Sequence, residues 1–139
     1  MPRAWSALEQ LFLNKFLNFC FFYYNMNYGT QFLGKKVSVI MDRPMGSKHP
    51  SCGFVYPVNY GYIKGIKAPD GDELDAYVLG VPRPLKEFTG RCIAVIHRTN
   101  DDDDKLVVVP EGVDFSDKEI RKFTHFQERW FKSEIVRKK

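Results

Sequence analysis

Six short segments rich in Val, Ile and aromatic residues follow one another between residues 37 and 109, and Gly and Pro separate them. Branched and aromatic side chains fit the pleated, half-buried surface of a β-strand, so we expect each segment to be a strand. Regular short strands of this kind predict a small barrel or a sandwich. The expected strands are Val37–Met41, Phe54–Val58, Tyr60–Ile63, Leu74–Leu79, Cys92–His97 and Leu106–Val109, with residues 80–90 as a loop around Pro82 and Pro84.

A helix is predicted after the last of these strands. The run Ser116-Asp117-Lys118-Glu119 has the pattern of a capping box, in which the Ser and Glu side chains bond the free N–H groups of the first turn. Beyond it, apolar residues recur at helical spacing on one side and basic residues on the other. We expect the basic side to face solvent and the apolar side to pack against the strands, through Ile120, Phe123, Phe126, Trp130, Phe131 and Ile135.

Composition and charge narrow the classes of function. The chain has 139 residues, of which 44% are hydrophobic, and this is enough for one domain with one core. Its net charge of +4 is uneven, with acids in residues 70–75 and 101–104 and bases in the last quarter. A nucleic-acid surface would carry a less interrupted basic face, so the pattern favours a site for metals and polyanions. Three widely spaced cysteines without metal-ligand spacing favour a reducing, intracellular compartment.

The first 25 residues differ in character from the rest. Residues 11–24 are apolar but are interrupted by Lys15 and two Asn, which makes the segment too short and too polar for a membrane span. Met26 opens the stretch that leads into the first strand. We expect residues 1–25 to be a non-native or disordered extension, with Met26 as the natural start, and residues 26–139 to be the folded domain. A weak membrane anchor is the alternative for the extension.

Three aspartates lie within six residues in the run Asp70-Gly71-Asp72-Glu73-Leu74-Asp75. Asp70 and Asp72 fall on a tight turn, and Asp75 falls on the strand that leaves it. Because side chains alternate along a strand, Asp75 and Tyr77 share one face while Leu74, Ala76 and Val78 take the other. Such close negative charges repel one another unless a cation binds between them, and Mg²⁺ prefers these oxygen ligands. A hydrated acidic turn is the simpler alternative, and the spacing does not fit an EF-hand.

The stretch Phe54-Val55-Tyr56-Pro57-Val58-Asn59-Tyr60-Gly61-Tyr62-Ile63, followed by the acidic run and Ala76, resembles the family I soluble inorganic pyrophosphatases. The acidic run satisfies every position of that family's signature, and the Tyr-Pro motif precedes it at about the expected distance. The resemblance covers roughly residues 37–132 and is strongest over residues 53–78. It implies a mainly β fold of the α+β type, a small five-stranded OB-type barrel with a C-terminal helix packed on it. It also implies an enzyme, an inorganic diphosphatase, with Mg²⁺ as cofactor.

The resemblance implies roles for individual residues as well. Asp72 would be the catalytic carboxylate, acting as general base or orienting the attacking water. The metal ligands would be Asp70, Asp75, Asp103, Asp101 and Asp42, with Asn100 as the alternative to Asp101. The substrate-binding residues would be Tyr60, Lys105, Lys132, Lys48 and Tyr56. Without the resemblance, the run Asp101–Asp104 would be a hydrated loop, and the tyrosines would fill an end of the barrel.

Two positions depart from the family pattern. Phe131 replaces a Tyr before Lys132, and a Phe ring donates no hydrogen bond to phosphate. The stretch Asp42–Pro50 is much shorter than the family's hairpin and lacks its glutamate, for which Arg43 or His49 are the candidate replacements. Along the sequence, Lys48 lies as far before Tyr56 as an arginine does in the family. Lysine and arginine are not equivalent in phosphate binding.

These features together predict a cytoplasmic hydrolase of phosphate metabolism that splits pyrophosphate into two phosphates by direct attack of metal-activated water. No Ser, Cys or His has the arrangement of a nucleophile and its base, so no covalent intermediate is expected. The expected partner is pyrophosphate, without nucleic acid or membrane, and a homo-oligomer is left open. Two alternatives are a phosphohydrolase for another phosphoanhydride, such as a nucleotide or polyphosphate, and an OB-type nucleic-acid-binding module without catalysis.

Overall fold

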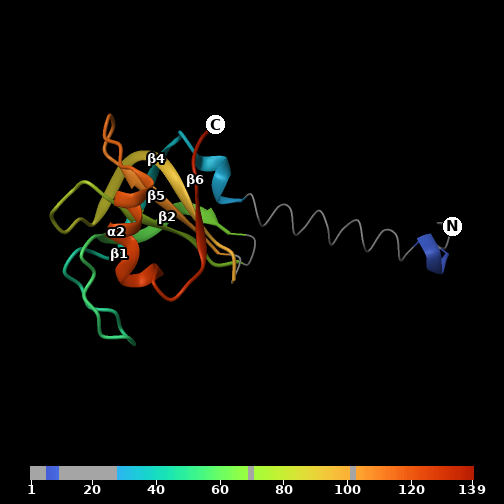
Figure 1. Cartoon of the computed structure of the whole chain (residues 1–139), viewed down its shortest axis with the longest axis horizontal. Coiled ribbons are helices and arrows are strands. Elements are labelled where there is room, and N and C mark those ends of the chain that lie inside the picture. Colours follow the sequence, from blue (N-terminus) through green and yellow to red (C-terminus); the bar gives the residue numbers. More distant parts are fainter. Residues whose placement is uncertain (1–5, 10–27, 69–70, 101–102) are drawn as a thin grey trace.

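Strands of the described residues close into a barrel, and a helix covers part of its outside (Figure 1). The computed structural model describes residues 6–9, 28–68, 71–100 and 103–139. A single 3-10 turn, η1 (Gly29–Phe32), precedes the strands. The strands are β1 (Lys36–Arg43), β2 (Asn59–Lys67), β3 (Glu73–Val78), β4 (Glu87–Arg98), β5 (Asp104–Val109) and β6 (Ser133–Val136), and helix α2 (Asp117–Glu128) lies between β5 and β6.

The order β1-β2-β3-β5-β4, with a further pairing of β4 and β1, makes a closed barrel of five strands. Strands β3 and β5 are parallel, and the other neighbours are antiparallel. Closure is made by β4, which is long enough to pair with β1 through its first half and with β6 through its second half. The predicted five-stranded barrel with a C-terminal helix is therefore confirmed, and β6, which lies beside the barrel on β4, was not among the predicted strands.

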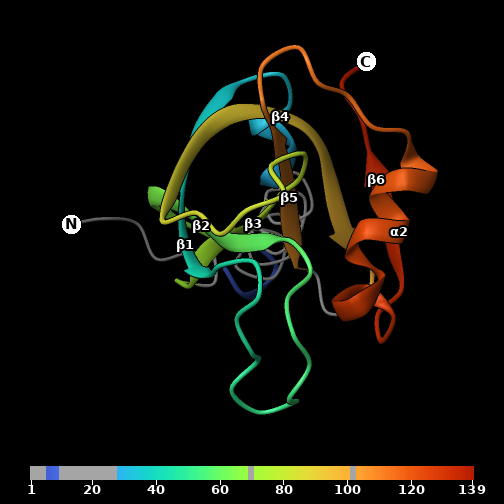
Figure 2. The same ribbon diagram turned by 90° about the vertical axis from the view of Figure 1, so that its left-hand side faces the viewer.

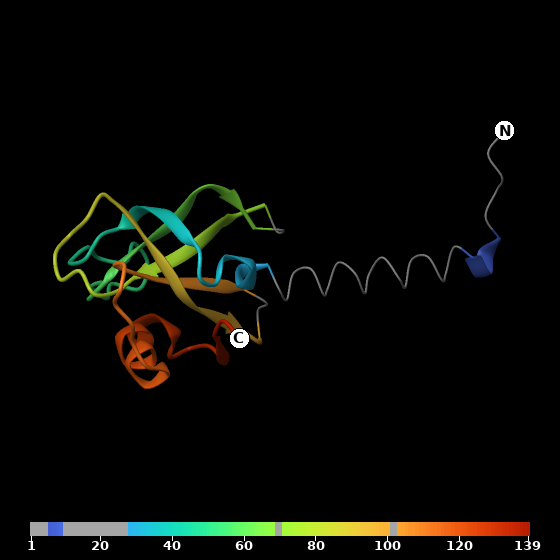
Figure 3. The same ribbon diagram turned by 90° about the horizontal axis from the view of Figure 1, so that it is seen from above.

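Alternate residues of the strands enter two separate apolar clusters. Leu74, Ala76 and Val78 of β3 point into the barrel, as the alternation predicted. Tyr77 of the same strand belongs to a second cluster on the outside of the barrel, under α2. Figure 3 shows α2, in orange, on one side of the barrel. This arrangement places Asp75, two residues before Tyr77, on the outer face next to the second cluster.

Helix α2 begins as predicted and ends earlier than predicted. Ser116 accepts a hydrogen bond from the backbone of Glu119, and the Glu119 side chain accepts one from the backbone of Ser116, so the capping box is confirmed. The helix ends at Glu128, so the predicted apolar side is wrong beyond this residue. Ile135 instead lies on β6, and Phe123 and Trp130 remain exposed.

Two predictions about strand limits were also wrong. Residues 54–58 are not a strand but part of a loop, residues 44–58, that projects from the barrel (Figure 2). Pro57 lacks the N–H that a sheet position needs, and the loop bonds to itself through Gly46, Ser47 and Tyr56. Residues 87–90 were predicted as a loop but begin β4, where they pair with β1.

No helix among the described residues is both long and apolar enough to cross a membrane.

Candidate active site

The side chain of Asp75 on β3 contacts side chains from the two neighbouring strands, β2 and β5. Its Oδ2 atom accepts a hydrogen bond of 2.7 Å from the phenol of Tyr60 on β2 and one of 2.8 Å from Nζ of Lys105 on β5. The register explains the contact with Lys105, because Asp75 and Lys105 are direct partners across the parallel strands. The Asp75 side chain remains 30% exposed, so the cluster of Tyr60, Asp75 and Lys105 opens to solvent. Three residues that the sequence singled out separately thus meet at one point.

Lys105 bridges two carboxylates. Its Nζ atom lies 2.8 Å from Oδ2 of Asp75 and also 2.8 Å from Oδ2 of Asp103. Burial by itself would lower the pKa of Lys105, but the charges of Asp75 and Asp103 outweigh it and hold the pKa above its ordinary value of 10.5. Lys105 is therefore a fixed positive charge beside Asp103, and the role of Asp103 as a metal ligand stays a prediction.

The phenol of Tyr60 stays protonated at any physiological pH. Burial raises its pKa well above the ordinary value of 10.0, and the charge of Asp75 raises it further. The ring packs edge-on against Tyr77 at 4.9 Å and lies 5.6 Å from the ring of Tyr56. These contacts fix the direction of the hydroxyl, so Tyr60 is a positioned hydrogen-bond donor.

Asp42 and Arg43 lie at the rim of the same face. The pairing of β1 with β2 shifts by one residue between Met41 and Arg43, and Asp42 is the extra residue of this bulge. Burial raises the pKa of Asp42 above 3.8, the charge of Arg43 opposes this, and the charge of Asp75 adds to it. Asp42 therefore lies close enough to Asp75 for the two negative charges to repel each other, and its role as a metal ligand stays a prediction.

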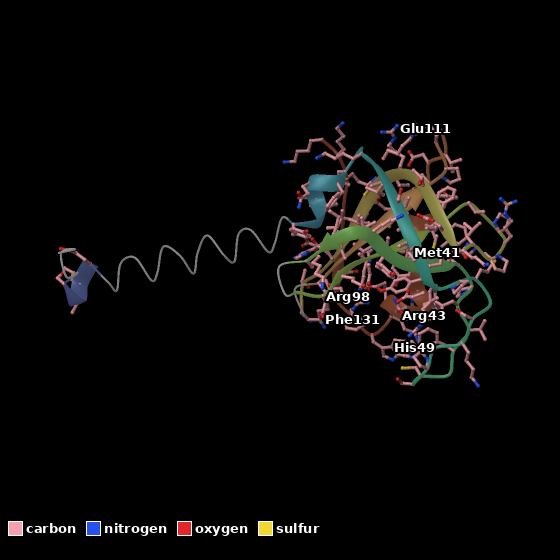
Figure 4. All side chains as sticks on the ribbon, turned by 180° about the vertical axis from the view of Figure 1, so that it is seen from behind. Met41, Arg43, His49, Arg98, Glu111 and Phe131 are labelled. Atoms are coloured by element: carbon pink, nitrogen blue, oxygen red, sulfur yellow. The ribbon has the colours of Figure 1, made fainter. Side chains whose placement is uncertain are left out.

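Tyr56 is buried, and its hydroxyl donates a 2.8 Å hydrogen bond to the side chain of Gln127 on α2. Burial raises the pKa of this phenol, whereas the positive charge of Arg43 lowers it. Arg43 is thus a cation close to Tyr56, and the substrate-binding role predicted for Lys48 stays a prediction. Lys48 lies exposed in the projecting loop, forming an isolated bridge with Val55, and no ion pair among the described residues includes it. In Figure 4, Arg43 lies at the barrel and His49 lies further out along this loop.

A buried ion pair at the end of β4 borders the cluster. Arg98 binds the carboxylate of Glu128 on α2 through two hydrogen bonds, of 2.8 Å and 2.7 Å, and Tyr77 donates a third of 2.6 Å to the same carboxylate. Burial opposes the charge of Arg98, but the bonds to Glu128 raise its pKa overall. The sequence analysis missed both residues. The signal for Glu128 is its position four and eight residues after Thr124 and Ile120, which form the buried stripe of α2.

Phe131 lies beyond the end of α2 and packs against Arg98, instead of lying on the apolar side of the helix where it was predicted. The Arg98 guanidinium lies 3.6 Å from the centre of its ring, and Figure 4 shows the two side chains next to each other. A Phe at this position therefore supports a buried cation. The next residue, Lys132, is exposed, and its carbonyl accepts a hydrogen bond from the backbone of Thr99 beyond β4. Lys132 thus lies beside the chain that follows β4, no ion pair among the described residues includes it, and its phosphate-binding role stays a prediction.

The acidic turn itself is only partly described. Asp72 is exposed directly before β3, and its carbonyl accepts a hydrogen bond from the backbone of Ala68. Asp70 and Asp101 lie outside the described residues. The predicted convergence of Asp70, Asp72 and Asp75 on one cation therefore stays a prediction.

The carboxylates on this face have the donor chemistry that a hard divalent cation prefers. Asp42 and Asp75 supply carboxylate oxygens on one solvent-facing surface, and each raises the energetic cost of the other's charge. No three His, Cys, Asp or Glu side chains among the described residues lie close enough together to hold a metal ion. A cation here would need a further ligand, and the acidic turn beside Asp75 is the source that the sequence offers.

Comparison with known proteins finds similarity to inorganic pyrophosphatases. The family model described as inorganic pyrophosphatase matches residues 35–136. The inorganic pyrophosphatase of Pseudomonas aeruginosa is 35% identical over 75 residues, which cover 50% of this chain and 42% of that protein. Inorganic pyrophosphatase 1 of Pseudomonas syringae is 38% identical over 60 residues, which cover 40% of this chain and 34% of the relative. The matched stretch thus spans less than half the length of each of these relatives.

Solved structures agree on the fold. The inorganic pyrophosphatase of Ehrlichia chaffeensis superposes with a TM-score of 0.59 at 22% identity, covering 76% of this chain and 87% of that one. The Helicobacter pylori enzyme superposes with a TM-score of 0.58 at 19% identity, covering 74% and 85%. At such identities the structures show the fold alone, and this fold is the OB-type barrel that the resemblance implied. Because the family model spans most of the chain, this protein belongs to the inorganic pyrophosphatase family.

Proposed function

We propose that this protein hydrolyses inorganic pyrophosphate to two phosphates with Mg²⁺ as cofactor, by direct attack of water. The observation that carries the proposal is the shared contact of Tyr60 and Lys105 with one carboxylate oxygen of Asp75 on a solvent-facing surface. Phosphoryl transfer depends mainly on positioning and on stabilisation of charge. A fixed cation, a fixed hydrogen-bond donor and a carboxylate at one point supply those requirements.

The carboxylates of Asp75 and Asp42 are the described residues that would hold the cation, with Asp70 from the acidic turn. When bound, Mg²⁺ neutralises charge on the diphosphate and lowers the pKa of the attacking water. The substrate carries several negative charges that repel a nucleophile. Lys105 keeps its proton at neutral pH and so contributes positive charge to the phosphate oxygens. The pKa of Tyr60 is also raised, so its hydroxyl keeps its proton and can donate a hydrogen bond to a phosphate oxygen.

Asp72 is the proposed general base. It is an exposed residue directly before β3, three residues before Asp75, and in this proposal its carboxylate accepts a proton from the attacking water. Removal of its charge would slow the reaction more than it weakens cation binding, because the role of the residue lies in proton transfer. The described members of the cluster include no Ser, Cys or His, so water is the attacking group in this proposal and no covalent intermediate forms.

The test is phosphate release from pyrophosphate by the full chain, with Mg²⁺ and with EDTA. Asp72→Asn should lower the rate by roughly 10²–10⁴-fold, the usual contribution of general acid–base catalysis. Asp114→Asn is the matched control, since Asp114 is exposed and pairs with Arg137 away from the cluster. A rate that falls equally in both variants would contradict the role of Asp72.

ATP and tripolyphosphate should be assayed beside pyrophosphate. Faster release from either compound than from pyrophosphate would overturn the proposed substrate in favour of another phosphoanhydride. The cytoplasmic location remains a prediction that localisation of the endogenous protein would test. A homo-oligomeric state remains a prediction that measurement of the protein's size in solution would test.

A further inference from the structure

A fixed positive charge lies among the carboxylates that were predicted to bind metal. Nη1 of Arg98 is 3.7 Å from Oδ2 of Asp103, the same oxygen that lies 2.8 Å from Nζ of Lys105. Two cationic side chains therefore approach one oxygen of Asp103. By contrast, among the described residues Asp75 forms an ion pair with Lys105 alone and accepts a hydrogen bond from the neutral phenol of Tyr60. The two carboxylates that Lys105 bridges thus differ in how far their charge is already neutralised.

Arg98 is held firmly in this position. The residue is 6% exposed, it binds Glu128 through two hydrogen bonds, and its guanidinium stacks on the ring of Phe131 at 3.6 Å. Glu128 in turn belongs to α2 and accepts a further bond from Tyr77. Glu128 of α2 and the ring of Phe131 therefore fix the guanidinium, and an arginine does not lose its proton in a protein. A cation approaching Asp103 meets this charge under every condition in which the protein is folded.

We infer that Arg98 takes the place of a divalent cation at Asp103, so that Asp103 is not a metal ligand in this chain. The inference rests on the proposed function only in assuming that the face around Asp75 binds a divalent cation. A guanidinium already supplies Asp103 with positive charge, and it repels a second cation from the same oxygen. Asp103 then acts as a positioning residue that holds Lys105, while metal binding is confined to the side of Asp75 and Asp42.

Binding of Mn²⁺, followed by the electron paramagnetic resonance signal of the free ion, tests this with the full chain. Asp75→Asn should weaken the tightest Mn²⁺ site by about 10-fold or more, the loss typical when a metal site is disturbed. Asp103→Asn should change that affinity by less than about twofold, because its charge is already satisfied. If Asp103→Asn weakens Mn²⁺ binding as much as Asp75→Asn does, the inference is wrong.

A second background makes the test independent of the natural metal site. Arg98→Met with Glu128→Gln removes both partners of the buried ion pair and keeps side chains of similar size, so no unpaired charge is left. In this background Asp103 loses one of its two cations. We expect one additional Mn²⁺ to bind, and we expect the added Asp103→Asn substitution to abolish that extra site. An unchanged number of bound ions in the folded double variant would overturn the inference.

The two experiments separate this inference from the proposed function. If the natural chain binds no Mn²⁺, the proposed function fails, but gain of an ion in the Arg98→Met/Glu128→Gln background would still support the role of Arg98. If the natural chain binds Mn²⁺ at Asp75 and the background gains nothing, the proposed function stands and the inference fails. Near-ultraviolet circular dichroism of each variant verifies that the barrel and α2 are intact.

Discussion

At the scale of single residues, Tyr60, Asp75 and Lys105 were named as site residues through the family resemblance, whereas their neighbours Arg98 and Glu128 were not. Tyr60 and Asp75 lie on predicted strands, and the alternation of β3 places Asp75 outside the barrel, but Lys105 precedes the predicted strand and its contact with Asp75 comes from the register of β3 and β5. Arg98 and Glu128 were missed because their meeting depends on how α2 crosses the end of β4. Lys48 lies exposed in the projecting loop, whereas Arg43 lies close to Tyr56, and local sequence does not specify the path of this loop.

Asp42→Asn should stabilise the protein at neutral pH. Burial and the charge of Asp75 raise the pKa of Asp42 in the folded state above 3.8. A raised pKa favours the protonated folded form, so this contribution to stability is present below pH 3.8 and is lost as the pH rises through the folded pKa. At pH 7 the melting temperature of the variant should be higher than that of the natural protein. At pH 3 the two melting temperatures should be equal. A lower melting temperature at pH 7 would contradict the proximity of Asp42 and Asp75.

Alkaline pH should destabilise the protein through its buried phenols. Burial raises the pKa of Tyr60 and of Tyr77 well above 10.0, and the charges of Asp75 and Glu128 add to the effect. The stability linked to these groups is complete below pH 10 and is lost as the pH rises beyond it. Urea unfolding between pH 8 and pH 11 should show a steep fall in the free energy of unfolding. Tyr60→Phe should make that fall shallower, and an unchanged slope would contradict the assignment.

At the scale of elements, the helix start was predictable and several element limits were not. A capping box is a local pattern, and α2 begins where that pattern lies. The end of α2 and the start of β6 depend on contacts with β4. The apolar residues keep their helical spacing beyond both points, so the sequence predicted a longer helix. Residues 54–58 have the composition of a strand, but their aromatic rings pack on α2, with Phe54 and Tyr56 both against Phe126. Tertiary packing therefore decided these limits.

Arg98→Met alone should loosen α2 from the barrel. The substitution leaves the Glu128 carboxylate, which is 8% exposed, without its cation. Breaking a buried ion pair in this way costs about 3–5 kcal/mol of unfolding free energy. Adding Glu128→Gln should restore most of that loss, since no buried charge remains. Urea unfolding of the two variants measures the difference, and equal stabilities would show that the pair does not anchor the helix.

At the scale of the whole molecule, closure of the barrel is the feature that sequence reasoning reached only through family resemblance. Short strands alone fit a sandwich as well as a barrel. The deciding contact is the pairing of β1 with β4, whose partners are about fifty residues apart in the chain and lack any local pattern. Closure also requires β1 and β2 to lie very close together at Gly61, which is the partner of Met41.

Gly61→Ala should disrupt the barrel as a whole. A Cβ atom at this position would overlap the backbone of β1, lying 2.7 Å from the carbonyl carbon of Ile40 and 2.8 Å from Cα of Met41. Backbone atoms of a closed barrel have little room to move, so the cost should reach or exceed the roughly 1–3 kcal/mol of ordinary overpacking. Lys64→Ala on the same strand is the control, since its exposed side chain should matter by less than about 0.5 kcal/mol. Equal thermal stability of the two variants would contradict this account of closure.

The most direct test of the central claim is the rate of phosphate release from pyrophosphate as a function of Mg²⁺ concentration, for the full natural chain and for Asp75→Asn. We expect release that needs Mg²⁺, stops with EDTA, and falls by orders of magnitude in the variant at every Mg²⁺ concentration. A folded natural chain that releases no phosphate, or an Asp75→Asn variant as fast as the natural chain, would show that the cluster of Tyr60, Asp75 and Lys105 is not the site of this reaction.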